Sequence, residues 1–415
     1  MAIIDKEPTL NTSALYDYIS GNRISNDAIL RYLLGNKMLD STSILSSIES
    51  YTDAVRSDTM FAEAYAGRAI ARSWGIYMRQ LDSSHLEKCI ADIKKARNLN
   101  KDLPETENAL GFYYYYCADK PDSALLHFSR ASSMDPGDYR PLFYMALVYR
   151  KTGQWERSQQ LMREVIRLRP RESIFLTNIG LSYTYLHKFD SAIIYHQAAI
   201  DALPSWYAPY LNKIEALLLK NGNTAGAWSV YRLAANSTTE DLTELQIRML
   251  IYDKKYREAF DTAHSRDPSV FRFPGNKYLL LSQISRLLKQ NQIAESYIDT
   301  ALISFKKYTA SEFNDHLLHS YTGIALAYKG DAINAEAEAQ LAMKQAEKNI
   351  LDKLDTKIIM AMIHVILGEY DKASPLIEDL LNGPSCFSLE LLQIDPVWAP
   401  FLSSPEYSTI INKSK

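Results

Sequence analysis

Residues 134–205 read MDPGDYRPLFYMALVYRKTGQWERSQQLMREVIRLRPRESIFLTNIGLSYTYLHKFDSAIIYHQAAIDALPS and contain three prolines at one fixed interval. Pro136, Pro170 and Pro204 are separated by 34 residues each. Between these prolines, one pattern of small and large apolar residues occurs twice. A pattern that recurs at a fixed period of roughly 20–50 residues is the signature of a repeat architecture. The stretch therefore predicts stacked structural repeats.

The unit at residues 139–172 shows why this pattern indicates a pair of helices. Leu142, Ala146 and Tyr149 recur at helical spacing, so their side chains share one face. Gly153 interrupts the pattern, because glycine takes the left-handed conformation that a tight turn needs. A second helix follows, and a proline that cannot continue it comes next. The matching positions of the following unit hold Leu176, Gly180, Tyr183 and His187.

These residues resemble the tetratricopeptide repeat (TPR) pattern. The resemblance implies an all-α fold, an α-solenoid in which antiparallel helix pairs stack into a right-handed superhelix. About ten TPR-like units fit residues 28–387, since each pair leaves an apolar face that a neighbour must cover. The best repeats lie at residues 104–206. Residues 1–27 are interpreted as a lead-in segment, and residues 388–415 as a C-terminal capping tail.

The unit after residue 206 departs from the pattern. Its apolar positions include Leu211, Ile214 and Leu218, but Glu215 stands where a small residue is expected. A long charged side chain at that position would hold two helices apart. Close crossing of the helices is therefore in doubt in this unit.

The tail has a pattern of its own. Residues 388–401 read SLELLQIDPVWAPF. Near the other end of the chain, residues 14–21 read ALYDYISG. Both segments resemble the ends of bacterial TPR regions that are fused behind transcription-regulator, adenylate-cyclase or protein-kinase effector domains. The resemblance implies a regulatory module whose effector lies outside this chain. The plainer interpretation is that Trp398, Phe401 and Tyr407 form an apolar lid on the last helix pair.

Composition excludes several classes of protein. With 415 residues, 47% of them hydrophobic, the chain is typical of an ordered protein, and a net charge of −3 does not indicate nucleic-acid or membrane binding. Cys89, Cys117 and Cys386 show neither a disulfide framework nor a zinc pattern, which favours reduced thiols in a cytoplasmic protein. No run approaches the ~18 apolar residues of a membrane span. A periplasmic location stays open if the chain is part of a membrane-anchored regulator.

The TPR resemblance implies that first helices line a concave groove. By repeat position, the expected partner-binding residues are Trp74, Phe112, Tyr115, Tyr116, Phe143, Arg150, Lys151 and Tyr185. Aromatic residues and arginine dominate interface hot spots, so this set suits a peptide or a partner helix. The alternative is that the aromatic run at residues 112–116 packs between neighbouring helices.

Other chemistry finds little support in the sequence. The Lys and Asn positions of the chaperone-binding TPR clamp are not matched, because Asn108 and Phe112 are followed by Phe143 and Leu147. His316 and His319 share a helix face, but a zinc site needs further ligands. No nucleophile elbow, phosphate-binding glycine loop or metalloprotease motif occurs. We therefore predict no enzyme activity, no cofactor, no metal and no small-molecule substrate.

Three functions follow, in order of preference. The first is a scaffold that binds a peptide or protein partner on the concave TPR surface. The second is the sensory or regulatory TPR module of a bacterial signalling protein. The third is an enzyme with an unrecognised site. Nucleic acid is disfavoured as a partner, because the basic residues between Arg150 and Arg171 are more simply explained as a solvated helix face.

Overall fold

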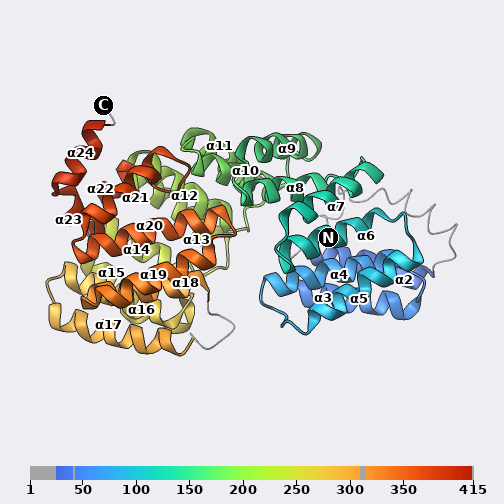
Figure 1. Ribbon diagram of the computed structural model, residues 1–415, viewed down its shortest axis with the longest axis horizontal. Helices are drawn as coiled ribbons and strands as arrows, with labels where there is room; N and C mark the ends of the chain where they lie inside the picture. The colour runs from blue at the N-terminus through green and yellow to red at the C-terminus, as the bar shows by residue number, and fades with distance from the viewer. Residues whose placement is uncertain (1–24, 41–42, 309–314, 414–415) are drawn as a thin grey trace. The chain divides into compact units, whose positions relative to one another are not determined.

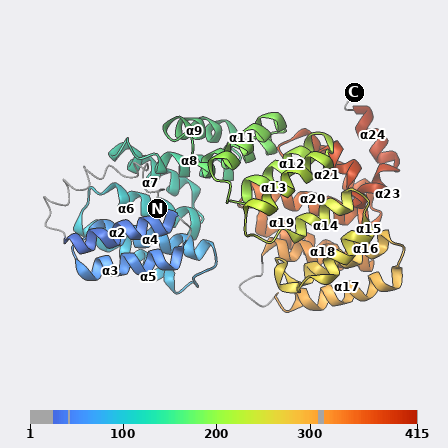
Figure 2. The ribbon, with the colours of Figure 1, turned by 180° about the vertical axis from the view of Figure 1, so that it is seen from behind.

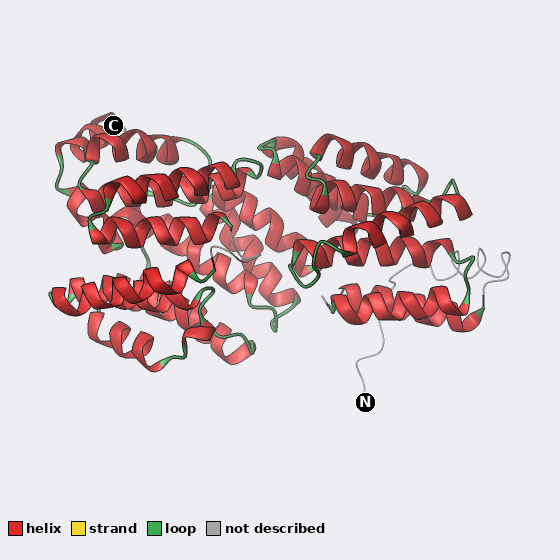
Figure 3. Cartoon of the chain, turned by 60° about the horizontal axis from the view of Figure 1, so that its bottom comes forward, coloured by secondary structure: helices red, strands yellow, loops and turns green. Residues whose placement is uncertain are grey.

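The computed structural model describes residues 25–40, 43–308 and 315–413 (Figure 1). Every regular element in these ranges is helical, as the colouring by secondary structure shows (Figure 3). The helices follow one another in ten pairs, so the predicted all-α solenoid of TPR-like helix pairs is confirmed. Most of the lead-in segment predicted for residues 1–27 lies outside the described ranges.

The chain forms two compact units, Met1–Val148 and Tyr149–Lys415. The boundary falls inside helix α8 (Arg140–Lys151), in the middle of the array rather than at its ends. The boundaries expected at residues 27 and 387 stay predictions. The first unit contains the pairs α2 (Asn26–Asp40) and α3 (Ile44–Ser57), α4 (Ala62–Tyr77) and α5 (His85–Leu99), and α6 (Pro104–Phe112) and α7 (Pro121–Met134). A π-helical turn, η1 (Tyr113–Cys117), follows α6.

The second unit continues the array and ends in the tail (Figure 2). After α8 its helices are α9 (Trp155–Leu168), α10 (Ser173–Tyr185), α11 (Phe189–Ala202), α12 (Ala208–Asn221), α13 (Thr224–Ser237), α14 (Thr243–Tyr252), α15 (Tyr256–Ser265), α16 (Pro274–Leu287), α17 (Asn291–Lys306), α18 (His316–Lys329), α19 (Ala332–Ala346), α20 (Ile350–Leu367) and α21 (Tyr370–Asn382). The short elements are η2 (Pro268–Val270), α22 (Leu389–Ile394), η3 (Pro396–Trp398), α23 (Ala399–Leu402) and α24 (Pro405–Lys413).

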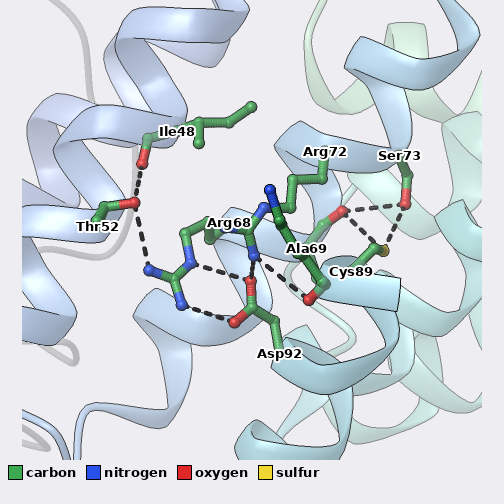
Figure 4. A network of polar contacts seen from close by, with 9 residues as sticks. Ile48, Thr52, Arg68, Ala69, Arg72, Ser73, Cys89 and Asp92 are labelled. Carbon is green, nitrogen blue, oxygen red and sulfur yellow. Dashed lines mark hydrogen bonds and ion pairs between the residues drawn. The ribbon is translucent and has the colours of Figure 1, made fainter. Parts of the chain in front are cut away.

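A buried ion-pair network joins three helices of the first unit (Figure 4). The Arg68 guanidinium on α4 donates two hydrogen bonds to the Asp92 carboxylate on α5, at 2.9 and 2.7 Å. Arg72 forms a second ion pair with Asp92, and Arg68 also donates to the Thr52 hydroxyl on α3 at 3.2 Å. A fork of donors around one carboxylate fixes geometry as well as charge. The network therefore sets how α3, α4 and α5 stack.

The tail packs onto the last helix pair. Trp398 and Phe401 are almost completely buried, in one apolar cluster with Ala361 of α20 and Ile377 of α21. Two further contacts bring the end of the chain to earlier helices of the second unit. The amide of Ser385, just before the tail, donates to the Tyr185 carbonyl at 2.7 Å, and a Cβ added to Gly222 would meet Ile394 of the tail. The tail therefore connects helices that are distant in the sequence.

A left-handed residue connects the two helices in every pair from α4/α5 to α20/α21. The residues are Arg79, Asp119, Gly153, His187, Gly222, Lys254, Lys289, Gly330 and Gly368, with φ between 50° and 79°. Glycine tolerates this conformation, whereas a residue with a Cβ is strained by about 1–2 kcal/mol. Five pairs carry this strain, so the turn is set by how the helices pack and not by glycine alone.

Substitutions at this turn should act in opposite directions. We expect Gly330→Ala to lower the free energy of unfolding by about 1–2 kcal/mol, because the backbone of this residue is left-handed and alanine is strained in that conformation. Lys289→Gly removes the same strain and should cost nothing, or stabilise by up to ~1 kcal/mol, after the larger entropy of the unfolded chain is counted. Thermal unfolding measures both. Equal destabilisation by the two variants would contradict the strain.

The helices of the α10/α11 pair cross at Gly180. A Cβ added to this glycine would lie 2.6 Å from Cε1 of His196, so only glycine leaves room for the imidazole. His196 is fully buried, and neither ring nitrogen has a hydrogen-bond partner among the described residues. Burial, with a smaller effect of Lys213, lowers the pKa of His196 to about 4. The imidazole is therefore packed in its neutral form.

His196 should make the protein sensitive to acid. Between about pH 6.5 and about pH 4 the unfolded chain binds a proton that the folded chain does not, so stability falls as the pH drops through this window. Methionine stands at the same repeat position in the preceding unit, as Met162. We expect His196→Met to reduce the loss of Tm between about pH 7 and about pH 5, by the equivalent of ~1–2 kcal/mol. An unchanged pH profile would show that His196 is not the cause.

Candidate binding cavity of the second unit

The second unit contains a partly open cavity of about 1270 Å³. Its helical lining comes from the first helices of six consecutive pairs, namely α10, α12, α14, α16, α18 and α20, with Tyr370 of α21 added. Lining residues from 386 to 400 bring the tail to its wall. Because first helices line the concave side of a helix-pair array, this cavity is the inner surface of the second unit.

Contacts between distant helices close the cavity. The Tyr185 hydroxyl on α10 donates to the Asp355 carboxylate on α20 at 2.8 Å, across 170 residues of chain. His187 Nε2 lies 3.0 Å from Oγ of Ser385, beside the tail. Trp155 and Leu219 pack with Tyr185 in one apolar cluster. The start and the end of the second unit are thus held together by both polar and apolar contacts.

The cavity wall carries more acidic than basic groups. Its acidic residues are Glu215, Glu244, Asp352, Asp355 and Asp395, and its basic residues are Arg248, Arg286 and Lys329. Two of the basic groups are engaged elsewhere. Arg286 bonds to the Glu295 carboxylate and the Tyr328 carbonyl, and Lys329 forms an ion pair with Asp299 at 2.6 Å. Arg248 alone makes no ion pair with any described residue.

Asp355 and Glu215 form the most unusual part of the wall. Burial, opposed by the Tyr185 hydrogen bond and assisted by Glu215 and Asp352, raises the pKa of Asp355 to about 7. Burial raises the pKa of Glu215 as well, against the effect of Arg248. Glu215 makes no hydrogen bond or ion pair with the described residues. Of these two carboxyl groups, Glu215 thus has one cation near it, Arg248, whereas no cation acts on Asp355.

A further group of lining residues surrounds Arg248, which interacts electrostatically with both Glu215 and Asp395. The Tyr252 hydroxyl donates to the Asp395 carboxylate of the tail at 3.4 Å, and burial raises the pKa of Asp395 while Arg248 lowers it. Arg248 has an exposed side chain, because it projects into the hollow of the cavity rather than into packed protein. This region therefore contains both charges, in contrast to the region around Asp355.

One buried amide adds a hydrogen-bonding group. Asn276 on α16 lines the cavity and is 4% exposed. Its Oδ1 has no hydrogen-bond partner among the described residues, and an unmade bond of this kind costs about 1–3 kcal/mol. Tyr321 on α18 lies on the same wall. The cavity thus holds a buried acceptor that a ligand donor would satisfy.

The residues expected to bind a partner are divided between the two units. In the first unit, Trp74 and Tyr116 stack edge to face at 5.3 Å, and Tyr115 meets Tyr116 at 4.5 Å. Phe112 and Phe143 are each 5% exposed. Phe112 packs in one apolar cluster with Phe128 and Val148, and the Phe143 ring lies against Tyr144 of its own helix. Partner binding by the aromatic set stays a prediction.

The expected residues of the second unit have different surroundings. The Arg150 guanidinium donates to the Asn178 carbonyl at 3.0 Å and to its side-chain oxygen at 2.8 Å, so this guanidinium joins α8 to α10. Lys151 is half-buried at the end of α8. Tyr185 is the one member of the set that lines the cavity, where it bonds to Asp355. A role in partner binding stays a prediction for all three.

Sequence reasoning missed most of the cavity. Glu215 carried a signal, since a charged residue stood at a position where the repeat expects a small one. The side chain lines the cavity, which explains how the array accommodates it. Arg248, Asn276 and Asp355 carried no signal, because only their positions on neighbouring first helices bring them to one wall.

Comparisons with known proteins find only low or partial similarity to this chain. No protein-family profile matches the chain. Cell division cycle protein 27 homolog A of Arabidopsis thaliana is 27% identical over 84 residues, which are 20% of this chain and 12% of that protein. The chain thus spans a small part of this relative. No comparison bears on a fused effector domain, which stays a prediction.

The solved structures that are similar to parts of the chain have low sequence identity to it. YrrB, described as a TPR protein with an unusual peptide-binding site, is 19% identical, with 48% of this chain and 97% of that chain covered and a TM-score of 0.29. A TPR protein from Parabacteroides merdae is 11% identical, with 73% and 100% covered and a TM-score of 0.40. The human IFIT1 dimer with PPP-AAAA is 14% identical, with 73% and 69% covered and a TM-score of 0.44. At these identities, no ligand or partner transfers to this chain.

A search of the described helices for a membrane span finds none that is long and apolar enough.

Asp355 should give the second unit a distinct pH dependence. The folded protein keeps this proton up to about pH 7, whereas the unfolded chain loses it near the ordinary pKa of 3.8, so stability falls as the pH rises through that window. We expect Asp355→Asn to raise Tm at about pH 8, by the equivalent of ~2–4 kcal/mol at most, and to change little at about pH 4. Asparagine can still accept the Tyr185 hydrogen bond. A variant that is less stable at both pH values would contradict a buried, proton-holding carboxyl.

Proposed function

We propose that the chain is a protein-interaction scaffold that holds an extended segment of a protein partner in the cavity of the second unit. The observation that carries the proposal is the cavity itself, lined by six consecutive first helices. Small-molecule pockets occupy roughly 300–1,000 Å³, and about 1270 Å³ exceeds that range. The size favours a peptide over a metabolite.

The chemistry of the wall also suits a polypeptide. Asn276 offers an unsatisfied acceptor for a backbone N–H, and tyrosines such as Tyr321 and Tyr328 add large amphipathic surfaces. Tyrosine side chains contribute contact area with little loss of conformational entropy. Leu280 and Ile359 provide apolar wall between them. A segment with alternating polar and apolar contacts would bury both kinds of group.

A cavity-filling substitution tests this function. Gln283 on α16 lines the cavity, so Gln283→Trp should obstruct it. Gln345 on the second helix α19 is exposed, and Gln345→Trp is the matched control. Peptides are selected on the unaltered protein from a random phage-displayed library and measured by fluorescence anisotropy. We expect Gln283→Trp to weaken binding at least ~10-fold, about 1.4 kcal/mol, and Gln345→Trp to leave it unchanged.

A third variant separates this cavity from the aromatic surface of the first unit. If Tyr115→Ala abolishes binding while Gln283→Trp does not, the partner binds at the sequence-predicted residues and the cavity proposal fails. If the selected peptides bind all three variants equally, neither surface is the site. Circular dichroism and Tm verify that each variant is folded.

A further inference from the structure

We propose that the cavity recognises a lysine or arginine side chain of the bound segment and seats its cationic group between Glu215 and Asp355. The proposal rests on the proposed function, because it specifies which chemistry the partner segment presents inside that cavity. It does not follow from the helix-pair fold, whose first helices can carry any side chain at these positions.

The first step is the uncompensated charge. Five acidic and three basic residues line the cavity, and Arg286 and Lys329 pair with Glu295 and Asp299. Arg248 is the one basic group left for the interior. Charges enclosed by protein interact more strongly than charges in water, so an excess of carboxylates creates a negative potential in the hollow.

The second step is that the two carboxyl groups are not neutralised: Arg248 acts on Glu215 without forming an ion pair, and no cation acts on Asp355. Glu215 on α12 has no hydrogen-bond or ion-pair partner among the described residues, and Asp355 on α20 has the Tyr185 hydroxyl alone. The groups that act on Asp355 are Tyr185 of α10, Glu215 of α12, Asp352 of its own helix and the neighbouring Cys386 thiol. None of them is a cation. A ligand cation would supply the missing charge.

The third step is the shape and polarity of the surroundings. Leu181, Leu351 and Leu391 pack in the cluster around Tyr185 and Cys386, and all three line the cavity. Lysine and arginine place their methylene stems along apolar surface while the charged end reaches polar groups. Charge-assisted hydrogen bonds from the ammonium or guanidinium to two carboxylates are roughly twice as strong as neutral ones. The wall thus fits both parts of a basic side chain.

A metal ion fits the same region less well. Among the described residues no group of three or more His, Cys, Asp or Glu side chains is arranged to hold a metal. Cys386 has a thiol whose pKa is raised far above its ordinary value, mainly by burial, so it is not a thiolate ligand. An organic cation can instead donate hydrogen bonds to the carboxylates of Glu215 and Asp355. The oxygen of the Tyr185 hydroxyl can accept a further one.

The test uses three labelled dodecapeptides of repeating Gly-X-Ser-Gly sequence, with X as Lys, Gln or Glu, and the full chain. At about pH 8 we expect the Lys peptide to bind at least ~10-fold tighter than the Gln peptide, and the Glu peptide to bind most weakly. Asp355→Asn and Glu215→Gln should each remove most of this preference. The matched control is Glu347→Gln. Glu347 is an exposed acid directly after α19, so this variant loses the same charge and should keep the preference for Lys.

The pH dependence provides a second readout. Because the cation binds the carboxylate form, the preference for Lys should shrink several-fold between about pH 8 and about pH 5.5, as Asp355 gains its proton. Asp355→Asn should flatten this profile. A merely structural role of Asp355 would change Tm without changing the preference among the three peptides.

Several outcomes would overturn the proposal. Equal binding of the three peptides would show that the cavity does not recognise the cation. If Glu347→Gln lost the preference for Lys as much as Asp355→Asn does, the peptide would be responding to the net charge of the protein and not to Glu215 and Asp355. Competition by spermidine at the affinity of the Lys peptide assigns the site to a free polyamine rather than a peptide side chain. Loss of binding with EDTA assigns it to a metal. If phage-selected peptides without Lys or Arg bind and are blocked by Gln283→Trp, the scaffold function stands and the cationic specificity fails.

Discussion

The hydrogen bond from Tyr185 to Asp355 is the contact on which the second unit depends. It joins the second pair of that unit to the last one, 170 residues away. Each helix pair covers its apolar face with the next pair, so an open array leaves its inner surface to water. The Tyr185 contact, with Ser385 and the packing of Trp155 and Leu219, brings the two ends together. An inner surface that would be an open groove becomes a partly closed cavity.

Enclosure changes the chemistry of ordinary side chains. A surface aspartate is ionised at neutral pH, whereas burial and two acidic neighbours raise the pKa of Asp355 to about 7. The same surroundings raise the pKa of the Cys386 thiol and leave Glu215 without a partner. The protein keeps these groups at a cost in stability, and perturbed groups of this kind gather at functional sites. That combination distinguishes the cavity from the Arg68–Asp92 network, in which the carboxylate forms ion pairs with two guanidiniums.

The repeat pattern shows which features of the fold can be predicted from the local sequence. Gly153 and Pro170 mark a turn and a helix end that recur along the chain, and the helix pairs were predictable from them. The same left-handed turn occurs at His187 and Lys289, where the sequence has no glycine from which it could be predicted. At Gly180 and His196 the reverse holds, since a small residue on one helix matches a large one on the next. Packing therefore imposes the repeat geometry even where the pattern has faded.

By itself the sequence determined the all-α fold and the pairing of helices. It could do so because these features depend on residues that are at most one repeat apart. The cavity was decided only by the tertiary structure. Glu215, Arg248 and Asp355 lie on three different first helices, and no spacing rule links them. The charges meet because the second unit closes on itself, and closure rests on contacts between residues that are distant in the sequence.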